Sequence, residues 1–378
     1  VTVSVLYWKR SPPSPPPTIT MSMFKPLKIG AIEAPNRFFM APLTRCRATE
    51  DGHVPTDMMV EHYAQRASAG LIIAEATMVQ DGHSAFLSEP GVYSPEQVAA
   101  WRKVTDAVHA KGGRIFLQIW HGGRACVPIN TGIDTTVAPS AIRIELHGVQ
   151  PEFNKTGEKI DYTTPRALET EEVPQVVAHF VAAAKNAMAA GFDGVEIHGA
   201  NGYLLDQFWR ASSNQRTDRY GGSIENRQRL TLEVVDAVAA AIGADRVGIR
   251  LSPLNSYNGM QDPEPEKITE LMCAELQKRG IAFVHVMRGD FFKQQQGDVV
   301  AAARRGFKGP IVANMFYTPE EAEEQVASGL VDAVAFGTKF LANPDLPERV
   351  KAGSPLNEAD PKTFYTRGAE GYTDYPAM

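Results

Sequence analysis

The chain has 378 residues, 43% of them hydrophobic, which is enough for a large buried core in one barrel or in two or three ordinary domains. Lys and Arg number 38 against 44 Asp and Glu, so the net charge is −6. A modestly acidic protein is a poor binder of nucleic-acid phosphates, which excludes that class of partner. The cysteines Cys46, Cys126 and Cys273 are far apart and lack CxxC spacing, which favours reduced thiols in a cytoplasmic protein.

The N-terminal residues 1–22 differ in composition from the rest of the chain. The apolar run over residues 1–8 is too short to span a bilayer, and its positive pair follows it, whereas a secretory signal carries its charge first. The Pro-rich stretch over residues 11–17 favours an extended polyproline conformation. We therefore expect a disordered tail over residues 1–22, with a Pro-rich docking peptide as the alternative, and one domain over residues 23–378.

Beyond the tail, short apolar runs alternate with helical patterns. Several runs are rich in Val and Ile without polar alternation, which is typical of strands buried on both faces. The expected strands are Phe38–Leu43, Leu71–Met78, Arg114–Trp120, Gly194–His198, Val247–Leu251, Phe283–Met287, Ile311–Ala313 and Ala333–Phe336. The clearest expected helices are Asp57–Ser68, Pro95–Lys111, Pro174–Ala190, Ser223–Ala241, Pro265–Arg279 and Thr318–Ser328.

This alternation predicts an α/β fold with a parallel sheet, either a (β/α)8 TIM barrel or a doubly wound open sheet. The number of strands and the absence of an early GxGxxG motif favour the barrel. Leu27–Gly30 and Ile32–Ala34 suggest a hairpin that plugs the barrel bottom. The long connection after the third strand holds a capping insertion at about residues 125–165, with a possible strand at Ala141–Leu146, and would lie over the active-site face.

The segment that follows the fourth strand carries three side chains suited to catalysis. His198 and Asn201 are three residues apart, and one helical turn would place both on one side, as two neutral donors for a substrate carbonyl. Tyr203 adds a phenolic proton that could be delivered to carbon. From spacing alone, a histidine and an asparagine that cap a helix beside a packed tyrosine explain the pattern at least as well.

Two further polar residues lie in apolar strands. Arg250 requires an anionic or strongly polar partner, which can be a bound cofactor or a structural salt bridge. Gln118 must be hydrogen-bonded and could contact either a heterocycle or a neighbouring strand end. The Gly337-Thr338-Lys339 sequence after the last strand occurs where barrels commonly bind phosphate. The nine histidines are scattered and form no HExxH motif, so we expect no metal site.

Most of the residues named above lie within longer sequence segments. Taken together, these segments resemble one protein family. The segments are Ala34–Arg37, Met40–Arg45, Tyr63–Gly70, Gln118–Arg124, His198–Phe208, Asn214–Gly222, Glu225–Arg227, Ala342–Asp345, Phe364–Tyr365 and Gly368–Pro376. In this order they resemble the old yellow enzyme family of FMN-dependent ene-reductases, from about Phe24 to Pro376. Thr44, in place of a cysteine, and the aromatic C-terminal segment resemble the plant, yeast and enterobacterial branch more than the thermophilic-type branch.

The resemblance implies a tightly but non-covalently bound FMN and a role for each residue around it. The residues that would contact the flavin ring are Pro42, Thr44, Ala76 and Gln118. Arg250 would face the flavin edge that is negative in the reduced cofactor. The phosphate would be held by backbone amides near Asn314, Met315, Gly337 and Thr338.

The resemblance also implies the reaction. NADPH or NADH would reduce FMN and leave, and an α,β-unsaturated aldehyde, ketone, imide or nitroalkene would follow in a ping-pong mechanism. His198 and Asn201 would hydrogen-bond the activating group, flavin N5 would give hydride to the β-carbon, and Tyr203 would protonate the α-carbon. Tyr365 would line the substrate pocket. The protein is expected to be a cytoplasmic monomer or homodimer without a membrane partner.

The chain departs from the family at the expected phosphate site. The family usually has an arginine directly after the strand-eight glycine, where this chain has Thr338, so either Lys339 replaces it or FMN binds more loosely. The Met315-Phe316 turn is also bulkier than the glycine-rich version common there. The alternatives to an ene-reductase are a non-catalytic flavin- or ligand-binding barrel and a metal-dependent barrel hydrolase.

Overall fold

The computed structural model describes residues 22–145 and 148–378. The prediction of a disordered tail over residues 1–22 therefore falls almost wholly outside the described residues.

Eight parallel strands close into a barrel, in the order β10-β11-β12-β3-β4-β5-β8-β9. Every residue in these strands is buried, which explains why the sequence shows no polar alternation. The predicted TIM barrel is confirmed, and the open sheet is excluded. The strands are β3 (Phe38–Met40), β4 (Leu71–Met78), β5 (Ile115–Trp120), β8 (Gly194–Gly199), β9 (Val247–Leu251), β10 (Phe283–Met287), β11 (Ile311–Asn314) and β12 (Ala333–Phe336).

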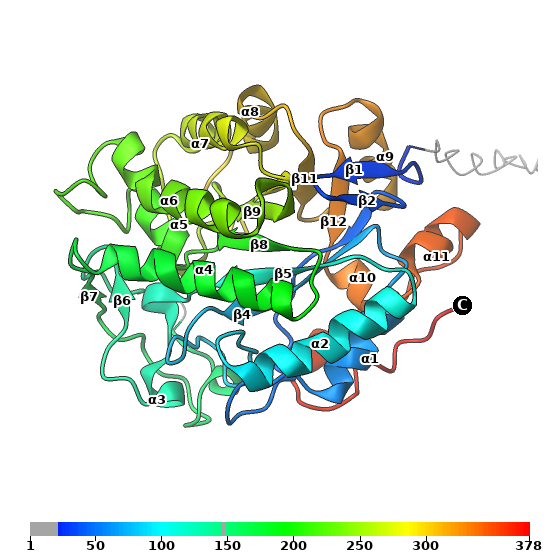
Figure 1. The fold of residues 1–378 in the computed structure, drawn as a ribbon, viewed down its shortest axis with the longest axis horizontal. Helices are drawn as coiled ribbons and strands as arrows, with labels where there is room; N and C mark the ends of the chain where they lie inside the picture. Colours follow the sequence, from blue (N-terminus) through cyan, green and yellow to red (C-terminus); the bar gives the residue numbers. More distant parts are fainter. Residues whose placement is uncertain (1–21, 146–147) are drawn as a thin grey trace, which may run out of the picture.

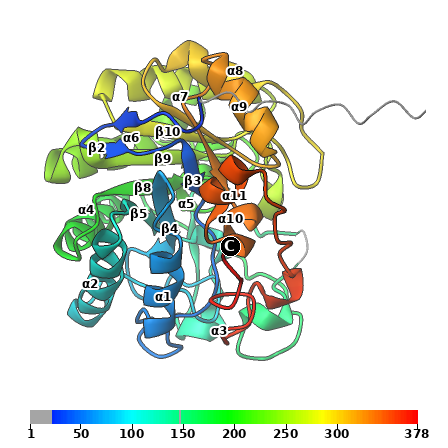
Figure 2. The ribbon, with the colours of Figure 1, turned by 90° about the vertical axis from the view of Figure 1, so that its right-hand side faces the viewer.

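Helices surround the barrel as an outer layer (Figure 2). The helix α2 begins with a capping box, in which the Ser94 hydroxyl accepts from the Gln97 amide and the Gln97 side chain accepts from the Ser94 amide. The longer helices match the predicted ones, and the shorter ones were missed because their apolar pattern spans too few turns. The helices are α1 (Asp57–Gln65), α2 (Pro95–Ala110), α4 (Val173–Ala189), α5 (Leu204–Trp209), α6 (Ile224–Ile242), α7 (Pro265–Arg279), α8 (Val299–Gly306), α9 (Pro319–Ala327), α10 (Thr338–Ala342) and α11 (Leu346–Ala352).

An antiparallel hairpin, β1 (Leu27–Ile29) with β2 (Ile32–Ala34), precedes the barrel. Its apolar side chains share one buried cluster with side chains of the barrel strands, among them Phe116 and Phe283. Gly30, in the turn, has φ +49°, and a Cβ there would lie 1.9 Å from the Asp245 carbonyl oxygen, so only glycine allows this approach. The hairpin therefore packs against the amino-terminal ends of the strands (Figure 1).

The connection between β5 and α4 lies on the side of the molecule opposite the hairpin (Figure 1). It contains the short helix α3 (Pro128–Thr131) and a parallel pair of two-residue strands, β6 (Val137–Ala138) and β7 (Arg166–Ala167). The strand predicted at Ala141–Leu146 is wrong over the described residues 141–145. Ile144 is buried there, but residues 141–145 pair with no strand of the described chain.

Candidate active site

A cavity of about 680 Å³ lies at the carboxyl ends of the barrel strands. Its size is in the range of about 300–1,000 Å³ that is usual for ligand pockets. All the predicted site residues line it, which are Pro42, Thr44, Ala76, Gln118, His198, Asn201, Tyr203, Arg250, Asn314, Met315, Gly337, Thr338 and Tyr365. Residues from seven strand ends and from the C-terminal segment are thus brought to one place.

His198 reaches the cavity from the end of β8, where it is buried. Burial lowers its pKa well below the usual value, and the Arg250 cation lowers this pKa further, so the ring is neutral. The Ala200 amide donates to Nδ1 at 3.3 Å, which puts the ring proton on Nε2. His198 is therefore a neutral Nε2–H donor.

Asn201 takes a left-handed conformation, with φ +57°, which asparagine tolerates better than most residues. Its amide donates to the Ser252 hydroxyl at 2.7 Å, which holds this turn. Asn255 Nδ2 donates to the Asn201 side-chain oxygen at 2.9 Å, so the Asn201 NH2 group remains as a donor. The expected helical turn between His198 and Asn201 is wrong, because α5 begins only at Leu204 and the two side chains meet at the cavity through this left-handed turn.

Tyr203 is the N-cap of α5, and its side chain lies between two other rings. It makes edge-on contacts with Trp120, at 5.0 Å between ring centres, and with His198, at 5.1 Å. Burial raises the pKa of Tyr203 well above its usual value, so the hydroxyl keeps its proton. Within residues 22–145 and 148–378 this hydroxyl has no hydrogen-bond partner. No side chain of the described chain caps α5, so the capping role considered from the sequence for His198 and Asn201 is not found.

Arg250 is buried at the end of β9 and lies opposite His198 in the strand pairing. Its Nη2 donates to Asn314 Oδ1 at 2.7 Å, and the Asn314 NH2 group donates to the Ala335 carbonyl at 2.7 Å. No salt bridge joins Arg250 to an acidic residue in the described part of the chain, and its Nε is buried without a partner. The structural salt bridge considered from the sequence is therefore not found, and an orphan cationic donor remains.

Glu196, one layer below His198 on β8, was missed as a site residue although an acidic side chain inside an apolar strand is a strong signal. Gln118 Nε2 donates to its Oε1 at 2.7 Å, which leaves the Gln118 oxygen as an acceptor. His285 Nδ1 lies 2.7 Å from its Oε2, and burial lowers the pKa of His285, so this neutral ring donates to the carboxylate. Glu196 thus fixes the orientation of Gln118.

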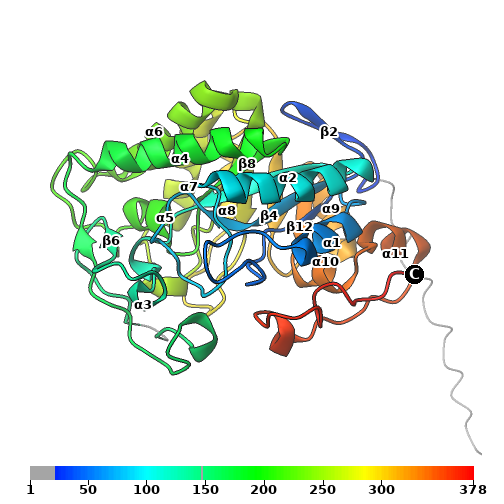
Figure 3. The same ribbon diagram turned by 60° about the horizontal axis from the view of Figure 1, so that its bottom comes forward.

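Tyr365 is brought to the cavity by arginines far away in the sequence. Arg45 Nε donates to the Phe364 carbonyl at 3.0 Å, and Arg47 Nη1 donates to the same carbonyl at 2.8 Å. Arg45 Nη2 also donates to the Gly371 carbonyl at 2.7 Å. In Figure 3 this red C-terminal segment folds back from α11 on the side of α1 and α10.

Aromatic side chains that the sequence did not single out form much of the cavity wall. Phe86 and Tyr365 are stacked with 6.1 Å between ring centres, and Phe291 and Phe316 meet edge-on at 6.4 Å. Phe316 is 74% exposed, which marks an apolar rim open to solvent. No periodicity in the sequence distinguishes such loop aromatics from core residues.

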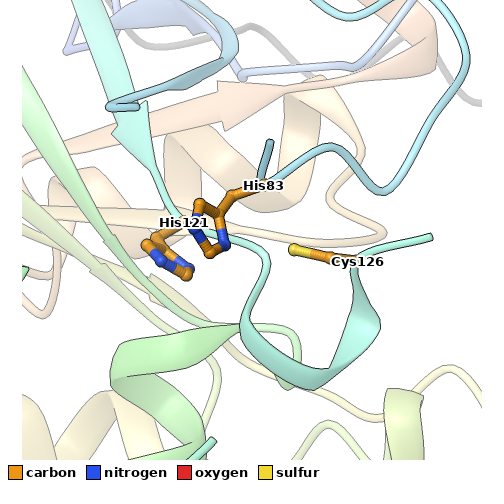
Figure 4. Close-up of side chains that lie close together, drawn as sticks. All are labelled: His83, His121 and Cys126. Carbon is orange, nitrogen blue, oxygen red and sulfur yellow. The ribbon is translucent and has the colours of Figure 1, made fainter. Parts of the chain in front are cut away.

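Three potential metal ligands lie together beside β5, although their sequence spacing gave no motif (Figure 4). The ligand atoms of His83, His121 and Cys126 are all within 4.8 Å of one another. The Gly123 amide donates to His121 Nδ1 at 3.0 Å, which occupies the one free lone pair of a neutral ring. A metal would have to displace this hydrogen bond, and the expectation of no metal site stays a prediction.

The residues present fit a flavin. The Arg250 guanidinium, which lines the cavity without an acidic partner in the described chain, suits the edge that becomes negative on reduction, and the Gln118 oxygen suits a ring N–H. Small or flat side chains, Pro42 and Ala76, leave room for a planar ring in the cavity. A closed parallel barrel with these cofactor-binding groups at the carboxyl ends of its strands is typical of the flavin-binding barrel oxidoreductases.

The chain belongs to the NADH:flavin oxidoreductase / NADH oxidase family, whose model matches residues 22–357. It is 56% identical over 357 residues to a probable flavin mononucleotide-dependent alkene reductase of Leishmania infantum, with 94% of this chain and 97% of that protein covered.

Two groups of solved structures are also similar. The old yellow enzyme from Trypanosoma cruzi is 50% identical with a TM-score of 0.92, over 94% of this chain and 98% of that one. A morphinone reductase in complex with tetrahydroNAD is 45% identical with a TM-score of 0.89, over 94% and 98%. These findings confirm the resemblance to the old yellow enzyme family and the prediction of an FMN-dependent oxidoreductase.

Proposed function

We propose that this enzyme reduces activated C=C bonds, in α,β-unsaturated aldehydes, ketones, imides and nitroalkenes, with NADPH or NADH as the reductant. The observation that carries the proposal is the convergence of His198, Asn201 and Tyr203 on one cavity beside the orphan Arg250 cation. The alkene reductase and the morphinone reductase that the chain resembles support it. When bound, FMN would supply the hydride that it has taken from the reduced nicotinamide.

Separate side chains bind the substrate, deliver the proton and hold the flavin. His198 Nε2–H and the Asn201 NH2 group both donate to the oxygen of the activating group, which stabilises the negative charge that develops there. Tyr203 delivers the proton to the α-carbon from a hydroxyl that stays protonated. Pro42, Thr44, Ala76 and Gln118 hold the flavin ring, and Tyr365 bounds the substrate.

The phosphate would be bound by backbone amides near Asn314, Met315, Gly337 and Thr338, at one end of the cavity. Lys339 also lines this end and has no ion pair in the part of the chain that the structure describes. We propose that it replaces the arginine usual in the family.

The cytoplasmic location and the monomeric or homodimeric state stay predictions. No helix of the described chain is long and apolar enough to cross a membrane.

The purified protein is expected to be yellow and to contain one FMN per chain, because the cavity presents a fixed cation and a polar edge to the cofactor. The absorbance spectrum and the flavin released on denaturation measure this content. A colourless protein that stays inactive when FMN is added would contradict the proposed function.

Neither His198 nor Tyr203 is expected to add a break to the pH profile of alkene reduction around neutral pH, since burial lowers the pKa of His198 well below its usual value and raises the pKa of Tyr203 well above its usual value. Stopped-flow reoxidation of the reduced enzyme by 2-cyclohexenone measures the profile. A break near pH 6.5 that disappears in His198→Asn would show that His198 is charged at neutral pH.

The alternative is a flavin- or ligand-binding barrel without turnover. The altered sequence at Thr338 and Lys339 is the feature that favours it, because weak phosphate binding would lower cofactor occupancy. Oxidation of NADPH that depends on added N-ethylmaleimide or 2-cyclohexenone separates the two functions.

A further inference from the structure

The turn after β11 places two successive non-glycine residues in the left-handed region of backbone space. Met315 has φ +90° and Phe316 has φ +60°. Neither is an asparagine or aspartate, the side chains that tolerate this region best, so the turn is strained. Such strain persists only where the surrounding structure enforces it, and it is concentrated at ligand sites. Both residues line the cavity near Gly337 and Thr338.

The side chain of Arg288, which follows β10, holds this turn. Its Nε donates to the Met315 carbonyl at 2.9 Å, and its Nη2 donates to the Phe316 carbonyl at 3.2 Å. The guanidinium also pairs with Glu321 in the first turn of α9, where Nη2 lies 2.9 Å from Oε2. Its Cζ lies 3.7 Å from the centre of the Tyr317 ring. One planar side chain thus engages both strained residues.

The direction of the carbonyls fixes the direction of the amides. In a trans peptide the C=O and the N–H point to opposite sides, so the amides of Phe316 and Tyr317 point away from Arg288. Neither amide has a hydrogen-bond partner among residues 22–145 and 148–378. Met315, Phe316 and Tyr317 line the cavity, whereas Arg288 does not. Successive unpaired amides around a left-handed residue form a concavity suited to an anion.

We infer that Arg288 is a positioning residue for the FMN phosphate, through the turn that it clamps. Glu321 neutralises its charge and its donors are directed at carbonyls, so it acts on the backbone rather than on the anion. Glycine at Met315 and Phe316 would adopt this turn without a clamp. Arg288 is what allows bulky residues there. The inference rests on the proposed function, because it assumes FMN in this cavity.

The test is FMN retention by the holoenzyme, read from the fluorescence of FMN released on dilution. Arg288→Ala is expected to weaken FMN binding about tenfold or more, the factor that corresponds to the strain of the turn. Arg304→Ala is the matched control, since Arg304 also donates to backbone carbonyls and pairs with an acid, Asp332, but the carbonyls that it holds, those of Leu330, Phe307 and Gly309, belong to residues that do not line the cavity. Failure of the wild-type protein to retain FMN would instead contradict the proposed function.

The decisive comparison repeats Arg288→Ala in a protein that carries Met315→Gly and Phe316→Gly. There the loss of Arg288 is expected to change FMN binding by less than about threefold, because the strain is gone. An equal loss in both backgrounds would show that Arg288 acts through its charge, and no loss in either would show that the clamp has no role. If Arg288→Ala does not fold, Arg288→Lys keeps the charge without the planar fork and is expected to follow the same pattern.

Discussion

Tyr203→Phe is expected to slow the reduction of the alkene by about 10²–10⁴-fold, the usual contribution of a positioned general acid. Only the hydroxyl is lost, and it has no hydrogen-bond partner within the described residues, so the packing on Trp120 and His198 is retained. Reduction of the flavin by NADPH is expected to change little, because it requires no proton from this group. Stopped-flow measurement of the two half-reactions separates these rates.

The matched control for this substitution is Tyr93→Phe. The Tyr93 hydroxyl bonds to Asp81 at 3.1 Å outside the cavity, so both half-reactions are expected to keep their rates. Equal slowing of the two half-reactions in Tyr203→Phe would show that Tyr203 is not the proton donor.

Loss of either oxygen-binding donor is expected to lower the rate of alkene reduction by about 10²–10³-fold, or about 2.7–4 kcal/mol. His198→Ala removes the Nε2–H donor from the cavity, and Asn201→Ala removes the NH2 donor. The double variant is expected to lose less than the product of the two factors, because both groups bind one oxygen. Single-turnover rates with 2-cyclohexenone and a nitroalkene measure the effect.

His109→Ala is the control for these variants, since His109 pairs with Asp193 at 3.0 Å away from the cavity. Asn201→Ala also tests the left-handed turn, because alanine tolerates φ +57° less well than asparagine. Asn201→Gly, which relieves that strain but restores no donor, is therefore expected to remain as slow as Asn201→Ala. Recovery of the rate in Asn201→Gly would show that Asn201 acts by adopting the left-handed turn rather than by donating to the substrate.

The barrel could be predicted because each strand is buried on both faces and reads as an unbroken apolar run. The site followed from the fold, because polar residues at the carboxyl ends of parallel strands, such as Gln118 and Arg250, must converge. The short helices and the pairing of β6 with β7 could not be predicted, because two-residue strands carry no periodicity.

Contacts between segments distant in the sequence were also beyond prediction. Asn255 directs the Asn201 amide, Glu196 orients Gln118, and Arg288 clamps the turn after β11, yet each looks like an ordinary polar residue in the sequence. The placement of Tyr365 depends on Arg45 and Arg47, which bind carbonyls over 300 positions away. Only the resemblance to a known family indicated Tyr365.

The most direct test of the proposed function is anaerobic double mixing, in which the enzyme is first reduced with one equivalent of NADPH and then mixed with 2-cyclohexenone. We expect the flavin absorbance to return at a rate that depends on the enone concentration, with one cyclohexanone formed per flavin. A flavin that stays reduced with the enone and is reoxidised only by oxygen would contradict the assignment of alkene reduction to this cavity.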